Sequence, residues 1–252
     1  MTSSVVSRLR AAGCVFAEDE ARLLLEAAAT PADLDAMVSR RVSGLPLEQV
    51  LGWVEFVGLR IALEPGVFVP RQRTSLLAWH AATLASRSSV VVDLCCGSGA
   101  VGAVVFAAVP GISLYAADIE PAAVRCARRN ITGPVYEGDL YSPLPAGLRV
   151  DVLVANAPYV PSDAVDLMPP EARLHEPLVA LDGGADGLDV LRRVVAGAPA
   201  WLAPGGHLLF ETSTGQADAA MAEVAGAGLT PETVTDEDLG ATVVTGRLAG
   251  MP

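Results

Sequence analysis

The sequence has few cysteines and few basic residues, and both shortages exclude classes of protein. Its four cysteines are Cys14, the adjacent pair Cys95 and Cys96, and Cys126. This spacing matches neither a zinc site nor a disulfide framework, so we predict reduced thiols and no metal site. Only 17 Lys and Arg residues stand against 29 Asp and Glu residues, which gives a net charge of −12. Such a chain repels phosphate backbones, and nucleic acid is therefore disfavoured as a partner.

Long apolar runs are also missing. A membrane-spanning helix needs roughly 18 uncharged apolar residues in a row, and Asp93 interrupts the most hydrophobic stretch of this chain. The N-terminal segment MTSSVVSRLRAAGCVF contains no continuous apolar region of the kind found in signal peptides. These absences predict a cytoplasmic protein without a membrane partner. With 252 residues, 52% of them hydrophobic and 18% charged, the chain is predicted to fold around a sizeable core.

The first part of the chain, residues 1–53, has the pattern of a small helical domain. Glu18 to Ala29 carries three consecutive leucines among charged residues. Thr30 and Pro31 then have the pattern of a helix N-cap followed by the first helical position. We therefore expect several short helices before the chain changes character.

Strand patterns begin after the helical part. Residues 54–70 predict a hairpin linker between two domains, with its turn at Glu64-Pro65-Gly66. In residues 71–252, strand-like runs alternate with room for helices, which indicates an α/β fold with a parallel sheet. The strand-like runs are SVVVDL, ISLYAADI, a short run ending at Glu137, VDVLVANA and GHLLFETS. The last two patterns, TPETVTDEDL and ATVVTGRLA, are predicted to pair as an antiparallel hairpin.

A glycine-rich loop follows the first of these strands and opens a helix, which is where α/β sheets bind nucleotide-like ligands. Gly97, Gly99 and Gly102 fit the G-x-G-x-x-G pattern, and Asp118 follows about 20 residues later, so a nicotinamide-dinucleotide site is one interpretation. Asp93 favours another. A carboxylate at the end of the strand can meet the amino-acid part of S-adenosylmethionine, whereas it would repel a pyrophosphate. Asp118 can accept hydrogen bonds from ribose hydroxyls in either case.

The tetrapeptide Asn156-Ala157-Pro158-Tyr159 follows the strand VDVLVA, beside the predicted ligand loop. An amide nitrogen is a poor nucleophile, so an enzyme that methylates it must hold and polarise its NH₂ group. The Asn156 side-chain oxygen and the Ala157 carbonyl, fixed by Pro158, can each accept one N–H hydrogen bond and aim the nitrogen at a methyl group. Tyr159 offers a ring face for a planar amide or base. The segment therefore favours methyl transfer to a planar amide or amine nitrogen.

Together these segments resemble those of the HemK/PrmC family of protein glutamine-N5 methyltransferases. The run LEQVLGWVEFVGLRIALEPGVFVPRQRT resembles the family's link between its two domains, and DLCCGSGA resembles its cofactor loop. NAPY resembles its NPPY signature, and HEPLVALDGGADGLDVLRRVV resembles its substrate-side segment. The resemblance implies a class I S-adenosylmethionine-dependent methyltransferase. Its fold would be a Rossmann-like, mostly parallel seven-stranded sheet ending in an antiparallel hairpin, with a small helical N-terminal domain that recognises the substrate.

The resemblance also implies roles for individual residues. By position, the cofactor would be bound by Cys95, Cys96, Gly97, Ser98, Gly99, Asp118, Leu140 and Asn156. Asp93 and Asp139 are further predicted cofactor-binding residues. Asn156 would also touch the substrate, and Ala157, Pro158 and Tyr159 would complete the acceptor site. The family's acceptor is the glutamine of a Gly-Gly-Gln loop in peptide-chain release factors, so the implied partner is a release factor. We also predict that the protein is a monomer.

This sequence departs from the family pattern at three positions and in the short length of its helical domain. Cys95 stands where glycine is usual, Ala157 replaces proline, and Arg73 replaces an acidic residue. Two other classes of protein stay open. One is an adenine-N6 methyltransferase acting on DNA or RNA, which the acidic charge disfavours. The other is a catalytically silent subunit or dinucleotide binder, which Asp93 and Asn156 together disfavour.

Overall fold

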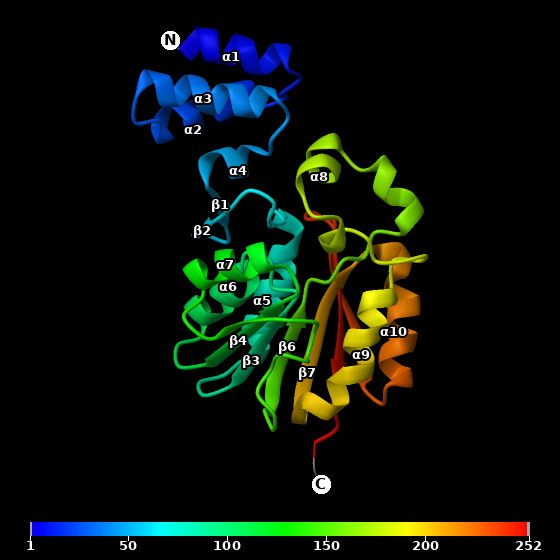
Figure 1. The fold of residues 1–252 in the computed structure, drawn as a ribbon. Helices are drawn as coiled ribbons and strands as arrows, with labels where there is room; N and C mark the ends of the chain where they lie inside the picture. Colours follow the sequence, from blue (N-terminus) through cyan, green and yellow to red (C-terminus); the bar gives the residue numbers. More distant parts are fainter. Residues whose placement is uncertain (1, 251–252) are drawn as a thin grey trace.

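A computed structural model describes residues 2–250, and its first four helices form a separate unit at the N-terminal end of the molecule (Figure 1). These helices are α1 (Thr2–Ala11), α2 (Ala17–Ala27), α3 (Pro31–Val42) and α4 (Leu47–Leu51). They enclose a core of their own that includes Leu9, Leu24 and Val38. The predicted N-cap is confirmed, because the Thr30 hydroxyl accepts a hydrogen bond of 3.1 Å from the Asp33 N–H at the start of α3.

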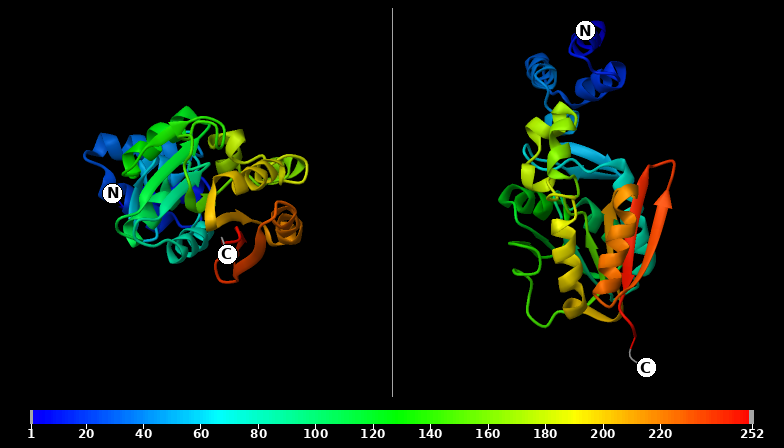
Figure 2. Two further views of the ribbon diagram at one scale, coloured as in Figure 1. Left: turned by 90° about the horizontal axis from the view of Figure 1, so that it is seen from below. Right: turned by 90° about the vertical axis from the view of Figure 1, so that its right-hand side faces the viewer.

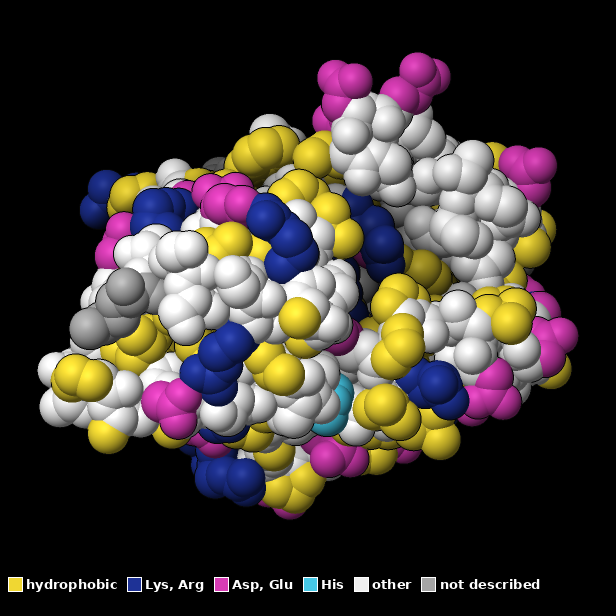
Figure 3. Space-filling view, turned by 90° about the horizontal axis from the view of Figure 1, so that it is seen from above, with side chains coloured by type: hydrophobic (Ala, Val, Ile, Leu, Met, Phe, Trp, Pro, Cys, Tyr) yellow, Lys and Arg dark blue, Asp and Glu magenta, His cyan; other side chains and the backbone are white. Residues whose placement is uncertain are grey.

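The helical unit is joined to the rest of the protein by polar contacts of Arg41 and Gln49. The Arg41 guanidinium pairs with both Glu20 carboxylate oxygens at 2.6 and 3.0 Å and with Glu171 of α8 (Pro170–His175) at 2.6 Å. Gln49 donates to the carbonyl oxygens of Val67 and His175. The division of the chain into three units at residues 53 and 70 stays a prediction. Seen from above, Arg side chains lie scattered among acidic and apolar ones at this end of the molecule (Figure 3).

The linker contains a hairpin, but its turn is not where the sequence pattern placed it. Strands β1 (Trp53–Phe56) and β2 (Leu59–Ala62) pair antiparallel. The predicted turn at residues 64–66 is wrong, because Val57 and Gly58 make the turn with φ values of 51° and 73°. Two central residues with positive φ are the mark of a tight type I′ hairpin turn. The triplet at 64–66 forms a second turn beyond β2, closed by a hydrogen bond from the Val67 N–H to the Glu64 carbonyl.

Seven strands form the main sheet, as predicted. They are β3 (Val90–Leu94), β4 (Ser113–Asp118), β5 (Val135–Glu137), β6 (Val150–Ala155), β7 (Leu202–Thr212), β8 (Thr230–Asp236) and β9 (Ala241–Arg247), in the order β5-β4-β3-β6-β7-β9-β8. The strands from β3 to β7 run parallel, whereas β9 is antiparallel to both of its neighbours. This arrangement confirms the Rossmann-like class I methyltransferase fold with a terminal antiparallel hairpin.

Helices cover both faces of this sheet (Figures 1 and 2). One face carries α5 (Ser75–Leu84), α6 (Ala100–Ala108) and α7 (Pro121–Asn130), and the other carries α9 (Asp189–Trp201) and α10 (Ala217–Gly226). Side chains of the central strands alternate between the two cores: Val91 packs with the first helix set and Val92 with the second. Strands buried on both faces explain the nearly continuous apolar runs in the sequence.

Short helical turns connect the larger elements. They are the 3₁₀ helices η1 (Gln72–Thr74), η2 (Ser162–Leu167), η3 (Leu178–Ala180) and η4 (Thr214–Gln216). Together with α8, η2 and η3 lie in the segment between β6 and α9, at the end of the sheet nearest the helical unit (Figures 1 and 2). No helix within residues 2–250 is long and apolar enough to cross a membrane.

Candidate active site

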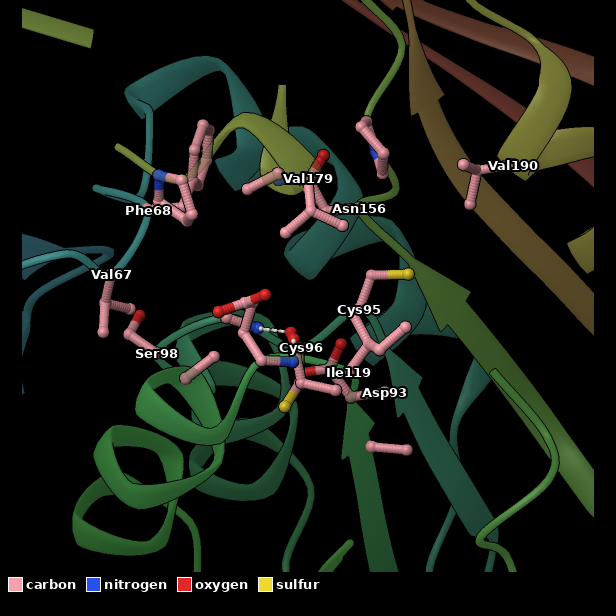
Figure 4. Close-up of a pocket in the computed structure, with 18 of the residues that line it drawn as sticks. Val67, Phe68, Asp93, Cys95, Cys96, Ser98, Ile119, Asn156, Val179 and Val190 are labelled. Carbon is pink, nitrogen blue, oxygen red and sulfur yellow. Dashed lines mark hydrogen bonds between the residues drawn. The ribbon is translucent and has the colours of Figure 1, made fainter. Parts of the chain in front are cut away.

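A cavity opens at the carboxyl ends of strands β3 to β6 (Figure 4), with an empty volume of about 1050 Å³ that includes its open mouth. Of the residues predicted to bind the cofactor, all but Gly99 line it. Those in the wall are Asp93, Cys95, Cys96, Gly97, Ser98, Asp118, Asp139, Leu140 and Asn156. From the predicted acceptor site, Pro158 also lines the cavity, whereas Ala157 and Tyr159 do not. Parallel strands bring all these positions to one edge of the sheet.

Several wall residues had not been predicted from sequence. Val67, Phe68, Pro70 and Thr74 come from the linker and η1. Pro177, Val179 and Ala180 come from η3, and Val190 and Arg193 from α9. For the residues of the linker and η1, the resemblance of the linker segment to the family was a usable signal in the sequence. It indicated the region, but it did not indicate which side chains reach the cavity.

The glycine loop is shaped by left-handed backbone conformations. Cys95, Gly97 and Gly99 have φ values of 52°, 54° and 79°. For a residue with a Cβ atom this region costs about 1 to 2 kcal/mol, so glycine suits the position that Cys95 occupies here. Gly99 does not line the cavity because it packs against the C-terminal end of α7: a Cβ atom there would lie 3.2 Å from Ala127 Cβ and 2.7 Å from Cδ1 of Ile131, the residue after the helix. Its role in the structure is close packing of the loop.

Asp93 is buried at the end of β3, with 1% of its surface exposed. Its Oδ2 accepts a hydrogen bond of 2.9 Å from the Gly102 N–H, one of the N–H groups that the first turn of α6 leaves without a helical partner. Burial raises the pKa of the Asp93 carboxyl to about 7. This carboxyl can therefore change its charge when a cation arrives in the cavity.

Asp118 joins the glycine loop to the start of α7. Its Oδ2 accepts from the Gly97 N–H at 2.8 Å, and its Oδ1 accepts from the Glu120 N–H at 2.9 Å. Burial raises the pKa of the Asp118 carboxyl, although these backbone hydrogen bonds oppose the shift. Each carboxylate oxygen keeps a lone pair, so Asp118 can accept further hydrogen bonds from a ligand in the cavity.

Asp139 and Leu140 approach the cavity from the loop after β5. The Asp139 carboxylate forms an ion pair with Arg193 of α9, so its charge is already balanced. Leu140 has a φ of 49° and is buried in the core that packs between the sheet and helices α9 and α10. These two positions therefore differ: Leu140 contributes apolar surface, and Asp139 contributes a paired charge at the rim.

The tetrapeptide after β6, residues 156–159, contains polar groups that form no hydrogen bond within the described part of the chain. The Asn156 side chain is half-buried in the cavity wall and forms no hydrogen bond with residues 2–250 (Figure 4). Ala157 is buried, and its carbonyl accepts no hydrogen bond from the described part of the chain. Tyr159 differs, because its hydroxyl donates to Glu211 Oε1 at 2.6 Å and accepts from Arg73 Nε at 3.0 Å.

Comparison with known proteins places this arrangement in a family. A family model described as "Methyltransferase small domain" matches residues 58–172. The release factor glutamine methyltransferase of Geobacter sulfurreducens is 36% identical over 187 residues, which cover 72% of this chain and 66% of that protein. The release factor glutamine methyltransferase of Cereibacter sphaeroides is 34% identical over 251 residues, which cover 90% of this chain and 89% of that protein. A methyltransferase structure from Pyrococcus furiosus, 15% identical, matches the fold with a TM-score of 0.59 over 84% of this chain and 98% of the other.

The sheet order, the loop at its carboxyl edge and the similarity to these relatives define a class I methyltransferase. Methyltransferases of this class take their methyl group from S-adenosylmethionine. Within the class, the chain belongs to the family of release factor glutamine methyltransferases.

Proposed function

We propose that this protein transfers the methyl group of S-adenosylmethionine to the side-chain amide nitrogen, N5, of the glutamine in the Gly-Gly-Gln loop of a peptide-chain release factor. The observation that carries the proposal is the position of Asn156. Its side chain has no hydrogen-bond partner in residues 2–250, and it stands in the wall of a cavity that also presents Asp93 and Asp118. Because the Asn156 side chain forms no hydrogen bond within the described part of the chain, its oxygen can accept one from the N–H of another amide.

The residues of the cavity fit S-adenosylmethionine. Asp118 would accept hydrogen bonds from the ribose hydroxyls, and Asp93 would meet the ammonium group, while the loop from Cys95 to Ser98 brings its backbone close. Ile119, Leu140 and Val190 supply apolar surface for the base. When bound, the cofactor supplies an electrophilic methyl group on a sulfonium. A cationic ligand explains why two carboxyls stand near each other in the wall of one cavity.

The acceptor amide would be held by Asn156 and Ala157. The Asn156 side-chain oxygen and the Ala157 carbonyl each accept one N–H hydrogen bond, which orients the nitrogen and increases its electron density. The nitrogen held in this way would accept the methyl group, and one of its two N–H protons would pass to water. Pro158 fixes the direction of the Ala157 carbonyl, and Tyr159 completes the acceptor site.

The release factor would also contact surfaces outside the cavity. Because Arg41 and Gln49 hold the helical unit beside α8, that unit lies within reach of a protein bound at the cavity mouth. Nucleic acid is the less favoured acceptor. The net charge is −12, and Arg side chains are scattered among acidic ones on the face seen from above (Figure 3).

The decisive experiment offers two acceptors side by side. The protein is incubated with labelled S-adenosylmethionine and either a purified release factor or an adenine-containing oligonucleotide, and the labelled residue is mapped by mass spectrometry. We expect one methyl group on the Gly-Gly-Gln glutamine and none on the oligonucleotide. Methyl transfer to adenine N6 without transfer to glutamine would establish the adenine-N6 activity in its place.

Replacing Asp118 with alanine should weaken S-adenosylmethionine binding by about 1.5 to 3 kcal/mol, the range for hydrogen bonds to a charged acceptor. The Gly97 and Glu120 N–H groups lose their acceptor in the same variant, so the loop itself is also less constrained. Isothermal calorimetry measures the change. An unaltered dissociation constant would show that the ribose is held elsewhere.

The raised pKa of Asp93 leads to a prediction about pH. In the unfolded chain this carboxyl titrates near its ordinary pKa, and in the folded protein near 7. The folded state therefore binds the proton more tightly, and the free energy of unfolding of the cofactor-free protein should fall as pH rises between about 4 and 7. Binding of the cationic cofactor should strengthen between about pH 5.5 and 7.5, as the carboxyl ionises. Calorimetry at several pH values tests both, and Asp93→Asn should flatten both profiles.

A further inference from the structure

Tyr159 is attached to the body of the enzyme at two points. Its hydroxyl donates to Glu211 Oε1 at 2.6 Å, and its carbonyl oxygen accepts from the Gln216 side-chain N–H at 2.9 Å. Arg73 adds a third partner, since its Nε lies 3.0 Å from the Tyr159 hydroxyl and 3.1 Å from Glu211 Oε1. The side chain therefore cannot turn without breaking contacts to η1 and β7, and the backbone cannot move without breaking the contact to η4.

Burial makes these contacts depend on one another. Glu211 is 2% exposed, and its second carboxylate oxygen, Oε2, is buried without a hydrogen-bond partner in the described part of the chain. A carboxylate so placed requires a nearby cation and a donor. Arg73 supplies the positive charge and Tyr159 supplies the O–H. The Tyr159 hydroxyl is thus committed to Glu211, and its donor is not available to a substrate.

Arg73 is the position at which this chain reverses the charge expected from the family resemblance. An acidic residue there would stand beside the buried Glu211 carboxylate and repel it. With arginine, the same place is filled by a cation whose guanidinium carbon also lies 5.9 Å from the centre of the Tyr159 ring. The reversal therefore strengthens the hold on Tyr159.

We propose that Glu211 and Arg73 are positioning residues that act through Tyr159 to keep the acceptor loop, residues 156–159, in one orientation. Tyr159 lies three residues beyond Asn156 in a short loop, so fixing the tyrosine limits how far the Asn156 side chain and the Ala157 carbonyl can move. The inference rests on the proposed function, in which those two groups hold the acceptor amide. Misplacement of reacting groups by about 1 Å can cost about 100-fold in rate.

A double-mutant cycle on turnover tests the proposal. Tyr159→Phe removes the hydroxyl, and Glu211→Gln removes the charge that holds it. We expect each variant to lower kcat for the release factor by about 10-fold, with an unaltered dissociation constant for S-adenosylmethionine. Because both substitutions break the same link, the double variant should be no slower than the slower single variant. Arg73→Gln should lower kcat in the same way, and Arg73→Lys should recover part of the loss.

Tyr141→Phe is the matched control. Tyr141 also donates its hydroxyl to a protein oxygen, the carbonyl of Val194, but away from the acceptor loop. It should lose stability as Tyr159→Phe does, without the fall in kcat. If the wild-type enzyme methylates the release factor and the effects of Tyr159→Phe and Glu211→Gln multiply in the double variant, the two residues act separately and the proposal is overturned.

Hydrogen exchange separates this inference from the proposed function. The Val160 N–H, next to the anchored tyrosine, donates to the Leu181 carbonyl at 3.1 Å. Its exchange should be faster in both Tyr159→Phe and Glu211→Gln, by a similar factor, and unaltered in Tyr141→Phe. A wild-type protein that fails to methylate a release factor refutes the proposed function. Unaltered exchange in both loop variants refutes the anchoring of the loop, whatever the acceptor.

Discussion

Asn156→Ala is expected to lower the turnover of glutamine methylation by a factor of about 100 or more, with little change in the affinity for S-adenosylmethionine. The Asn156 side chain forms no hydrogen bond within residues 2–250, so its removal leaves no other protein group without a partner. Its oxygen acts on the acceptor amide, and mainly when the nitrogen becomes more positive during transfer. Turnover on a purified release factor and calorimetry with the cofactor measure the two quantities.

Ala157→Pro is the companion variant for this experiment. The carbonyl that we assign to the acceptor amide is retained, and the Ala157 N–H that proline removes donates no hydrogen bond in the described part of the chain. Turnover should therefore stay near that of the wild type. Near-normal turnover of Asn156→Ala on the same release factor would contradict the assigned role of Asn156.

Gly187→Ala is expected to lower the free energy of unfolding by about 3 kcal/mol or more. Gly187 has a φ of 78°, and a Cβ atom there would lie 2.3 Å from the Tyr159 carbonyl oxygen and 2.4 Å from Gln216 Nε2. The substitution thus adds backbone strain and pushes apart the hydrogen bond that holds the tyrosine. Denaturant unfolding followed by circular dichroism gives the loss of stability.

Gly228→Ala separates strain from collision. Gly228 has a φ of 81°, close to that of Gly187, but a Cβ atom there would have no other atom within 4 Å. It should cost only the strain of a left-handed conformation, about 1 to 2 kcal/mol. An equal loss of unfolding free energy in the two variants would mean that the collision with Tyr159 does not destabilise the folded protein.

The parts of the site that follow from strand order were predictable from the sequence. Asp93, Asp118 and Asn156 each stand where a predicted strand ends, and parallel strands bring their carboxyl ends to one edge of the sheet. Local patterns sufficed to find those strands, because Val-rich runs buried on both faces are distinctive. The same rule gave the loop of Asn156 its place beside the glycine loop.

Contacts between distant segments were not predictable in this way. Arg73 meets Glu211, 138 residues further along, only because η1 lies over the end of β7. Nothing in the local sequence around either residue records that meeting. The hairpin turn was misplaced for a local reason: Glu64-Pro65-Gly66 has the composition of a turn, whereas Val57 is an unfavourable residue for positive φ and gave no signal. Hydrogen-bond register with β2 determined the outcome.

The ion pairs of Arg41 have a consequence for the order in which the chain folds as it is synthesised. The helical unit leaves the ribosome before the sheet, with Glu20 already able to pair with Arg41. Glu171 follows 130 residues later, and His175, which accepts from Gln49, comes 126 residues after its partner. At a synthesis rate of about 5 to 20 residues per second, roughly ten seconds pass between synthesis of the helices and synthesis of these partners. Its final docking must therefore follow synthesis of strands β3 to β6, which precede Glu171 and His175 in the chain. Until then the helical unit is only marginally stable, because it is small.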